Sequence, residues 1–454
     1  MADTTFLDFL TPIQASWLND VNDLTYKEII SPERYGAIGD GTTDDTIAWQ
    51  NAINAMATAG GGVVRGVAGS VYKITNTLNI KTGVQIDLGG SQIVQHTTNT
   101  PIFAPVASTI CTHWSIRNGT LKFNTQQTSS NTLGVGIRLA NGAFSYDFII
   151  SNLIVDQACD GILNGTSAGT FAFVGKIENF IGLRCAAYAI NIACDSAAGA
   201  NTNLVFTNCW ALQLAGSEIS TSKGFYFKAC SQSQWNSLFA DHVQNEFCYF
   251  ESCSGSWGVL TAESCDWIRS SGVLSAVTFA DCFGNIQSLQ FLLNTITTSA
   301  TGEIYLVRPT TSSGTFRMNI ENWRSSNNIY TGSAIYEVNP SANMIVLNGY
   351  ASLDRTAQFA NHASIEQWNG GYLTGSATYD PASLADGAGA TTTVTVTGAA
   401  LGDFAMASFS LDLQGITLTA WVSATNTVSV RFKNETGGVI DLASGTLKAI
   451  VLKR

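Results

Sequence analysis

The sequence has 454 residues, of which 12% are charged, and 22 basic against 33 acidic side chains give a formal net charge of −11. A nucleic-acid-binding surface needs clustered basic residues, which this balance does not offer, so we exclude nucleic acid as a partner. No apolar run reaches the ~18 residues of a membrane span, and no basic and apolar leader follows Met1. We therefore expect neither membrane insertion nor secretion.

Residues 1–33 carry one short helical pattern. Trp17, Leu18, Val21 and Leu24 fall on one face of a helix. So short a helix is marginal by itself in water, so it needs a partner. That partner is either the chain's own next element or another protein, and the pattern favours neither.

Residues 34–80 predict a helix framed by glycine turns and followed by short strands. Trp49, Ala52, Ile53 and Met56 recur at helical spacing and form one apolar stripe, and three glycines at 60–62 end the helix. Because the rest of the chain is rich in strand patterns, this stripe must cover the end of a β-structure.

Three acidic residues precede this helix, and by residue type and proximity in sequence they resemble a metal-binding cluster. Asp40 lies in a glycine-rich turn, and Asp44 and Asp45 lie where a helix cap is needed. We interpret all three as turn and cap residues. We predict no metal site and no cofactor, and the scattered His96, His113, His242 and His362 show no ligand spacing.

Beyond the helix the sequence repeats with a period near one turn of a parallel β-solenoid. The pattern Phe-x-x-Cys occurs at Phe206/Cys209, Phe227/Cys230, Phe250/Cys253 and Phe279/Cys282. Equivalent residues stack in such a fold, so we expect inward ladders of phenylalanine and cysteine. Asparagine tolerates the left-handed conformation of a bend and can bond its neighbours along the stack, which we predict for Asn118, Asn152, Asn179, Asn208 and Asn322.

The ten cysteines lie between Cys111 and Cys282 and include no C-x-x-C pair. In a chain that is not secreted, paired disulfides are not expected. We predict ten free thiols buried as small apolar side chains.

From Tyr379 the sequence pattern changes. A linker is followed by segments with the alternating pattern of strands, at 404–413, 416–424, 427–434 and 446–453. Glycine turns separate these strands. The pattern predicts a separate β-sandwich or jelly-roll unit of roughly 75 residues.

The ordered string YGAIGDGTTDDT, the helix, GGG and VAGSVYKI resembles the N-terminal signature of the pectate-lyase-like superfamily, as found in phage tailspikes and tail fibres. The family's usual proline before the alanine-glycine turn is Val67 here. The resemblance implies an all-β fold: a right-handed single-stranded parallel β-helix with an N-terminal capping helix and a small C-terminal β-sandwich.

Two further resemblances concern the chain ends. SWLNDVNDLTY is similar to a segment near the N-termini of phage tail proteins, and the C-terminal strands resemble a trimerisation or tip module of such proteins. We therefore expect a virion-attachment segment at 1–33, a β-helix domain at 34–378 and a trimerisation or tip domain at 379–454.

The resemblance implies a phage tail fibre or tailspike, assembled in the host cytoplasm as a homotrimer and located in the virion tail. Its N-terminus would attach to the tail, the baseplate or an adaptor protein, and it would recognise host cell-surface polysaccharide. The alternative is a polysaccharide depolymerase, either a glycoside hydrolase or a lyase, that cleaves capsule or lipopolysaccharide. A free pectate lyase is disfavoured, because no leader and no Asp/Lys/Arg cluster are visible.

Cleaving a glycan needs two carboxylates, or a carboxylate and a base. The best candidate catalytic group is the set Asp241, Glu246, Glu251, Glu263 and Asp266. Tryptophans cluster in the same stretch, and aromatic faces suit sugar rings, so we expect glycan binding by Trp235, Trp257 and Trp267.

Within this set, the repeat places Glu251 outward, one coil on from Lys228. That neighbour favours a base or nucleophile at Glu251, with Glu246, Glu263 or Asp266 as the protonated partner. The competing interpretation is a solvated solenoid face with tryptophans in a trimer interface.

Overall fold

The computed structural model describes residues 29–165, 170–194, 200–269, 274–298, 304–310, 317–326, 329–331, 335–338, 345–347, 352–353, 365–366 and 372–452. The chain divides into two compact units, Met1–Ile365 and Glu366–Arg454, which we describe separately. The helix expected around Trp17 lies outside the described residues.

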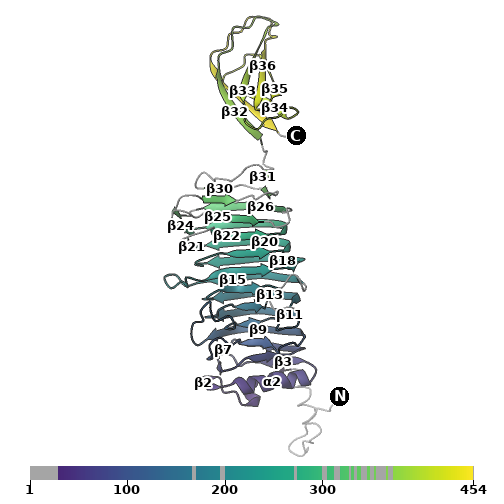
Figure 1. Cartoon of the computed structure of the whole chain (residues 1–454), viewed down its shortest axis with the longest axis vertical. Helices are drawn as coiled ribbons and strands as arrows, with labels where there is room; N and C mark the ends of the chain where they lie inside the picture. The colour runs from purple at the N-terminus through teal and green to yellow at the C-terminus, as the bar shows by residue number, and fades with distance from the viewer. Residues whose placement is uncertain are drawn as a thin grey trace, which may run out of the picture. The chain divides into compact units, whose positions relative to one another are not determined.

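Parallel strands stacked coil upon coil form the first unit (Figure 1). One long sheet, here sheet A, contains β1 (Ile29–Ile30), β2 (Asp40–Asp44), β3 (Gly62–Arg65), β4 (Val71–Ile74), β6 (Val84–Asp87), β7 (Gln92–Gln95), β9 (Cys111–Phe123), β11 (Ser145–Asp156), β13 (Ala172–Leu183), β15 (Asn201–Leu212), β17 (Cys230–Ser231), β18 (Ser233–Asp241), β20 (Ser254–Glu263), β23 (Phe283–Leu292), β26 (Arg317–Ser326), β29 (Ile345–Leu347), β30 (Ser352–Leu353) and β31 (Ile365–Glu366).

Two further parallel sheets complete the coils. Sheet B contains β5 (Leu78–Ile80), β8 (Phe103–Pro105), β10 (Ile137–Arg138), β12 (Ile162–Asn164), β14 (Tyr188–Ile192), β16 (Lys223–Lys228), β19 (Cys248–Glu251), β22 (Leu274–Ala280), β25 (Ile304–Thr310) and β28 (Ile335–Val338). Sheet C contains β21 (Asp266–Arg269), β24 (Thr295–Thr298) and β27 (Ile329–Thr331).

Strand register confirms the predicted right-handed parallel β-helix. Ile177 of β13 lies opposite Phe206, Phe206 opposite Trp235, and Trp235 opposite Trp257 on the next coil. All four side chains are buried, so each coil contributes one rung to a continuous apolar core. Period-two alternation directs the intervening residues outward.

The capping helix is also confirmed. Helix α2 (Thr46–Thr58) follows the 3-10 helix η1 (Pro32–Tyr35) and buries Trp49, Ala52, Ile53 and Met56 against the first coil. Figure 1 shows α2 at one end of the stack. No helix in the ranges that the structure describes is long and apolar enough to cross a membrane.

The acidic residues before α2 accept local hydrogen bonds, but only part of the expected cap is present: Asp44 Oδ1 accepts from Thr46 N at 3.0 Å, whereas Asp45 makes no side-chain cap bond. Asp40 accepts hydrogen bonds from the backbone N–H groups of Thr43 and Thr42, and these bonds lower its pKa. Asp45 accepts from Ile38 N and Gly39 N at 2.7 and 3.1 Å.

The inward ladders are confirmed in part. Phe227, Phe250 and Phe279 lie in register on sheet B, fully buried. Phe206, however, lies on sheet A in register with Trp235. Placing Phe206 in the same ladder was wrong, because the same local pattern occurs on two different sides of the coil.

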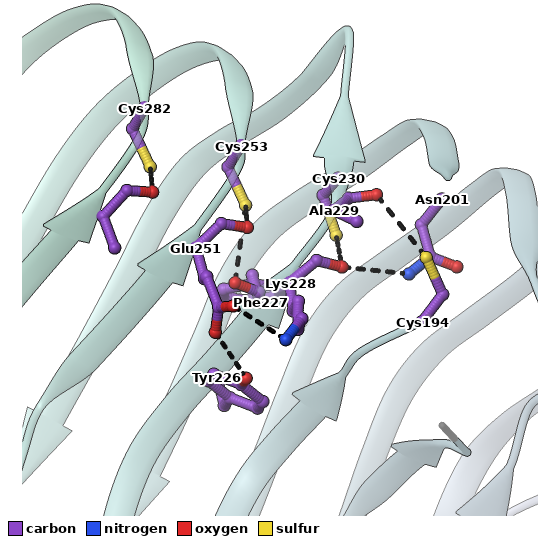
Figure 2. Close-up of polar contacts among 11 residues, drawn as sticks. Cys194, Asn201, Tyr226, Phe227, Lys228, Ala229, Cys230, Glu251, Cys253 and Cys282 are labelled. Carbon is purple, nitrogen blue, oxygen red and sulfur yellow. Dashed lines mark hydrogen bonds and ion pairs between the residues drawn. The ribbon is translucent and has the colours of Figure 1, made fainter. Parts of the chain in front are cut away.

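All ten cysteines are free and buried, as predicted. Cys230, Cys253 and Cys282 lie on successive coils. The Cys253 thiol donates to Phe227 O of the preceding coil at 3.4 Å (Figure 2), and the Cys282 thiol donates to Phe250 O at 3.5 Å. Burial raises the pKa of Cys230 and Cys282 well above the ordinary value, so these thiols stay protonated and serve packing.

The asparagine bends are confirmed for the four positions that can be followed. Asn118, Asn152, Asn179 and Asn208 all have positive φ, between 50° and 63°. Each Nδ2 of the last three donates to the Oδ1 of the preceding asparagine at 2.9–3.1 Å. The side chain of Asn322 lies outside the described part.

The second unit is an antiparallel β-sandwich, as predicted. One sheet has the order β32 (Tyr372–Tyr379), β37 (Gly445–Leu452), β34 (Phe404–Phe409), and the other has β33 (Gly389–Thr395), β36 (Thr427–Lys433), β35 (Thr417–Ala424). Its own core includes Val394, Val430, Phe432 and Leu447. Strand β32 pairs with β37 along its whole length, so residues 372–378 belong to this sandwich, whereas the sequence placed them in the β-helix domain.

Candidate functional site

The outer face of sheet B carries three half-buried tyrosines on consecutive strands. In β16, Phe225 and Phe227 are buried while Tyr226 points outward, and in β19 Cys248 and Phe250 are buried while Tyr249 points outward. We call this surface the tyrosine face and define it as Tyr188, Asn191, Lys223, Tyr226, Lys228, Glu246, Tyr249 and Glu251.

Parallel register aligns these side chains in columns along the β-helix. Asn191 lies opposite Tyr226, and Tyr226 opposite Tyr249. The ring centroids of Tyr188 and Tyr226 are 5.7 Å apart, and those of Tyr226 and Tyr249 are 5.5 Å apart. The three rings therefore form one aromatic surface that crosses β14, β16 and β19.

Glu251 connects this surface to charged groups. Its Oε1 lies 2.7 Å from Lys228 Nζ, and its Oε2 accepts a hydrogen bond from the Tyr226 hydroxyl at 3.0 Å (Figure 2). Burial, and then the charge of Glu251, raise the pKa of Tyr226 far above its usual value. Tyr226 thus remains a protonated hydrogen-bond donor across the physiological range.

Tyr188 is held by a second cation. Lys223 Nζ donates to the Tyr188 hydroxyl at 3.1 Å and lies 5.1 Å from the ring centroid. Burial, and then the nearby Glu246, raise the pKa of Tyr188. Lys223 therefore anchors one end of the aromatic row, while Lys228 acts on its central ring, Tyr226, through Glu251.

A buried carboxyl lies beneath this row. Asp160 accepts from the backbone N–H of Tyr188 at 2.8 Å and from Asn191 Nδ2 at 3.1 Å. Burial raises its pKa to about 6, because desolvation outweighs these bonds and the charge of Lys223. Asp160 thus fixes the position of two residues of the tyrosine face.

Glu246 lies on the opposite side of the face from Glu251. Its Oε1 accepts from the Thr278 hydroxyl at 2.9 Å, and Thr278 Oγ1 lies 2.7 Å from Ser275 Oγ. Rings, hydroxyls, ammonium groups and carboxylates thus alternate on one outer surface. Aromatic rings with adjacent hydrogen-bonding groups are suited to bind polar ligands that have an apolar side, as sugar rings do.

The structure separates the predicted catalytic carboxylates into different places. Glu251 lies opposite Lys228, as the repeat predicted. Glu246 precedes β19 and has a different partner: its Oε1 accepts from Thr278, whereas Glu251 contacts Lys228 and Tyr226.

Two other candidate carboxylates share one register position. Asp241 of β18 lies opposite Glu263 of β20, on the outside of sheet A, and Asp241 Oδ1 is 2.6 Å from His242 Nδ1. Asp266 begins β21 in sheet C, and its side chain lies outside the described part. Among the described residues, no group of three or more His, Cys, Asp or Glu side chains has the arrangement of a metal site.

The expectation that Trp235 and Trp257 bind glycan is wrong. Both side chains are 0% exposed and stack on each other at 4.8 Å in the core of the β-helix. A ring enclosed by Phe227, Phe250 and Phe279 cannot contact a ligand in solvent. The side chain of Trp267 lies outside the described residues.

Sequence reasoning missed the tyrosines, although a signal was present. Each tyrosine of β16 and β19 directly precedes the phenylalanine of a Phe-x-x-Cys repeat, at 226 and 249. If the phenylalanine points inward, alternation directs its neighbour outward. The same repeat that identified Glu251 therefore predicts that Tyr226 and Tyr249 point outward.

A second outer feature is an apolar stripe on sheet A. Ile154, Ile181, Trp210 and Phe239 lie in register on four consecutive coils, and all are half-buried. The rings of Trp210 and Phe239 stack at 4.6 Å. We call this row the apolar stripe.

No family model matches the chain. Among solved structures, the chain is similar to a tailspike protein mutant of E. coli bacteriophage HK620 in complex with a pentasaccharide, with a TM-score of 0.48, 10% identity and coverage of 96% of this chain and 95% of that one. It is also similar to PfbA, a surface adhesin of Streptococcus pneumoniae, with a TM-score of 0.44, 14% identity and coverage of 75% and 100%. A third similar structure is the A-module of the Azotobacter vinelandii mannuronan C-5 epimerase AlgE4, with a TM-score of 0.37, 14% identity and coverage of 74% and 99%.

Proposed function

We propose that this chain is a phage tail fibre or tailspike that recognises host cell-surface polysaccharide through the tyrosine face. The observation that carries the proposal is the row Tyr188, Tyr226 and Tyr249, in which Lys223 donates to the hydroxyl of Tyr188 and Glu251 accepts from the hydroxyl of Tyr226. Such a surface offers sugar rings both an apolar contact and hydrogen bonds.

Substitution of the central ring tests this proposal. We expect Tyr226→Ala to weaken binding of purified host capsule or lipopolysaccharide at least tenfold, measured by calorimetry. Tyr35→Ala is the matched control, because Tyr35 is 38% exposed near the capping helix, outside the tyrosine face. Equal affinity of Tyr226→Ala and wild type would overturn the assignment of the face.

The alternative function is a polysaccharide depolymerase, and one observation supports it. Asp241 and Glu263 are in register on adjacent strands, which are about 4.8 Å apart in a sheet. That spacing is close to the separation of carboxyl groups in retaining glycosidases, roughly 5–5.5 Å. New reducing ends or unsaturated products after incubation with host glycan would identify turnover.

We propose that the protein assembles as a homotrimer in which the apolar stripe packs against a neighbouring copy. A half-buried row of Ile, Trp and Phe on an outer face is typical of an interaction surface. The C-terminal β-sandwich would support trimerisation or form the tip, and the N-terminal segment 1–33 would attach to the tail, the baseplate or an adaptor. Ten free, buried cysteines suit assembly in the host cytoplasm before incorporation in the virion tail.

A further inference from the structure

One half-buried cation on the outer face of sheet B has no partner among the residues that the structure describes. Arg138 ends β10, and its Nε is shielded from solvent without a hydrogen-bond acceptor in that part of the chain. Other partly buried cations do have carboxylate partners: Arg184 pairs with Asp156, and Lys228 pairs with Glu251 at 2.7 Å. Arg138 therefore differs from its counterparts.

An unpaired guanidinium in this position is unfavourable. Burial alone lowers the pKa of Arg138, with no compensating charge from a described neighbour. A guanidinium nevertheless remains protonated in proteins. Its desolvation is thus an uncompensated cost, which an incoming anion would offset.

Arg138 belongs to the same column as the tyrosine face. It lies opposite Leu163, Leu163 lies opposite Asn191, and Asn191 lies opposite Tyr226. Three coil spacings of about 4.8 Å separate Arg138 from Tyr226 by roughly 14 Å. A glycan that runs along the column over Tyr226 and Asn191 would reach Arg138.

The guanidinium packs beside a residue without a side chain. Arg138 Nη2 lies against Gly165, where an added Cβ would come within 3.2 Å of it. Any larger residue at 165 would crowd the guanidinium. Arg138 can then present its planar fork, which matches the two oxygens of a carboxylate or phosphate.

We propose that Arg138 is an oxyanion subsite at one end of the tyrosine face and binds a carboxylate or phosphate carried by a sugar of the recognised polysaccharide. The inference rests on the proposed glycan-binding function and adds the ligand class: an acidic glycan.

The test uses the full chain and three monosaccharide probes: galacturonate, glucose 6-phosphate and glucose. Saturation-transfer NMR titrations give a Kd for each probe with wild type, Arg138→Gln, Arg138→Lys and Lys176→Gln. Lys176 is an exposed cation on sheet A, so Lys176→Gln removes the same charge elsewhere. We expect wild type to bind galacturonate or glucose 6-phosphate more tightly than glucose, and whichever acid binds identifies the oxyanion.

Arg138→Gln should weaken binding of that acid at least tenfold and leave glucose unchanged. Arg138→Lys should weaken binding of the acid less than Arg138→Gln does, because lysine keeps the charge but lacks the planar guanidinium. Lys176→Gln should bind the acid with the same Kd as wild type. Equal Kd values for Arg138→Gln and wild type, or no preference for either acid over glucose, would overturn the inference.

Two further measurements separate this inference from a structural role and from the proposed function. Removing an uncompensated charge should leave the thermal midpoint of Arg138→Gln at or above that of wild type, whereas a lower midpoint with unchanged acid binding would make Arg138 structural. If Tyr226→Ala weakens glucose binding while Arg138→Gln leaves the Kd of every probe unchanged, the tyrosine face is supported as the glycan-binding surface and the oxyanion subsite is ruled out. If Tyr226→Ala is also without effect, the proposed function itself fails.

Discussion

Lys228 and Glu251 lie directly opposite each other on adjacent coils, and Lys228 Nζ is 2.7 Å from Glu251 Oε1. The two side chains are 32% and 29% exposed, so solvent screens the pair. Such pairs contribute about 0–1 kcal/mol to stability. The pair therefore matters less for folding than for orienting Glu251 toward the hydroxyl of Tyr226.

Glu251→Gln tests whether this orientation serves function. The substitution keeps the shape of the side chain and removes its charge, so we expect stability to change by less than about 1 kcal/mol. If the protein turns over polysaccharide with Glu251 as base or nucleophile, the rate should fall by orders of magnitude with binding largely kept. Reducing-end assays with host glycan measure this rate.

Glu178→Gln is the matched control, because Glu178 is half-buried on the outside of sheet A, away from the tyrosine face. Unchanged turnover in Glu251→Gln would move the reaction elsewhere, and Asp241 with Glu263 would be the next pair to substitute. No turnover by wild type on its own host's glycan would leave a receptor-binding fibre.

The asparagine bends predict a local stability effect. Asn179 has φ of 50° and shares amide hydrogen bonds with Asn152 and Asn208. Asn179→Gly loses these two bonds, at a cost of about 1 kcal/mol each. Asn179→Ala also places a Cβ-bearing residue without local bonds in the left-handed region, which costs about 1 kcal/mol more.

Urea denaturation of both variants measures the difference. The order wild type, glycine, alanine in decreasing midpoint is the expected result. An alanine variant as stable as the glycine variant would show that the left-handed conformation at position 179 does not strain a residue that has a Cβ.

The sequence predicted those features in which local chemistry and periodicity agree. The stripe from Trp49 to Met56 has one helical period, and asparagine suits a left-handed bend wherever it occurs. Lys228 and Glu251 each directly follow the phenylalanine of a repeat. Because Phe227 and Phe250 lie in register, the 23-residue step between them also predicted that Lys228 lies opposite Glu251.

Features that depend on the side of the coil were less predictable. Coil lengths vary, so an identical Phe-x-x-Cys pattern put Phe206 on sheet A and Phe227 on sheet B. Residue type also does not decide direction: Trp235 and Trp257 occupy inward positions, while Trp210 occupies an outward one. Arg138 could not be recognised from sequence, since its lack of a described partner is a property of the folded surface.

Asp160 predicts a pH dependence of stability. Its pKa is about 6 in the folded chain against 3.8 for an unperturbed carboxyl, so the native state binds the proton more tightly than the unfolded state. The free energy of unfolding therefore falls as pH rises from about 4 to about 6, and the loss is complete above pH 6. A shift of about two pKa units corresponds to roughly 3 kcal/mol.

Comparison with Asp160→Asn isolates this contribution, because asparagine does not titrate. We expect the thermal midpoint of wild type to fall relative to that of Asp160→Asn as pH rises from 4 to 7. Asp386→Asn, in the second unit, controls for the loss of one carboxylate. A difference that stays constant across this range would contradict the raised pKa of Asp160.

The apolar stripe predicts the surface used for self-association. Phe239 is half-buried at the end of the row, and a carboxylate there would have to be desolvated against a neighbouring copy. We expect wild type to be a trimer at micromolar concentration and Phe239→Glu to dissociate to monomers, as measured by light scattering during size-exclusion chromatography. Gln234→Glu adds the same charge at an exposed position of the same strand, β18, and should remain trimeric. A monomeric wild type would remove the trimer, whereas a trimeric Phe239→Glu would move the interface to another face of the chain.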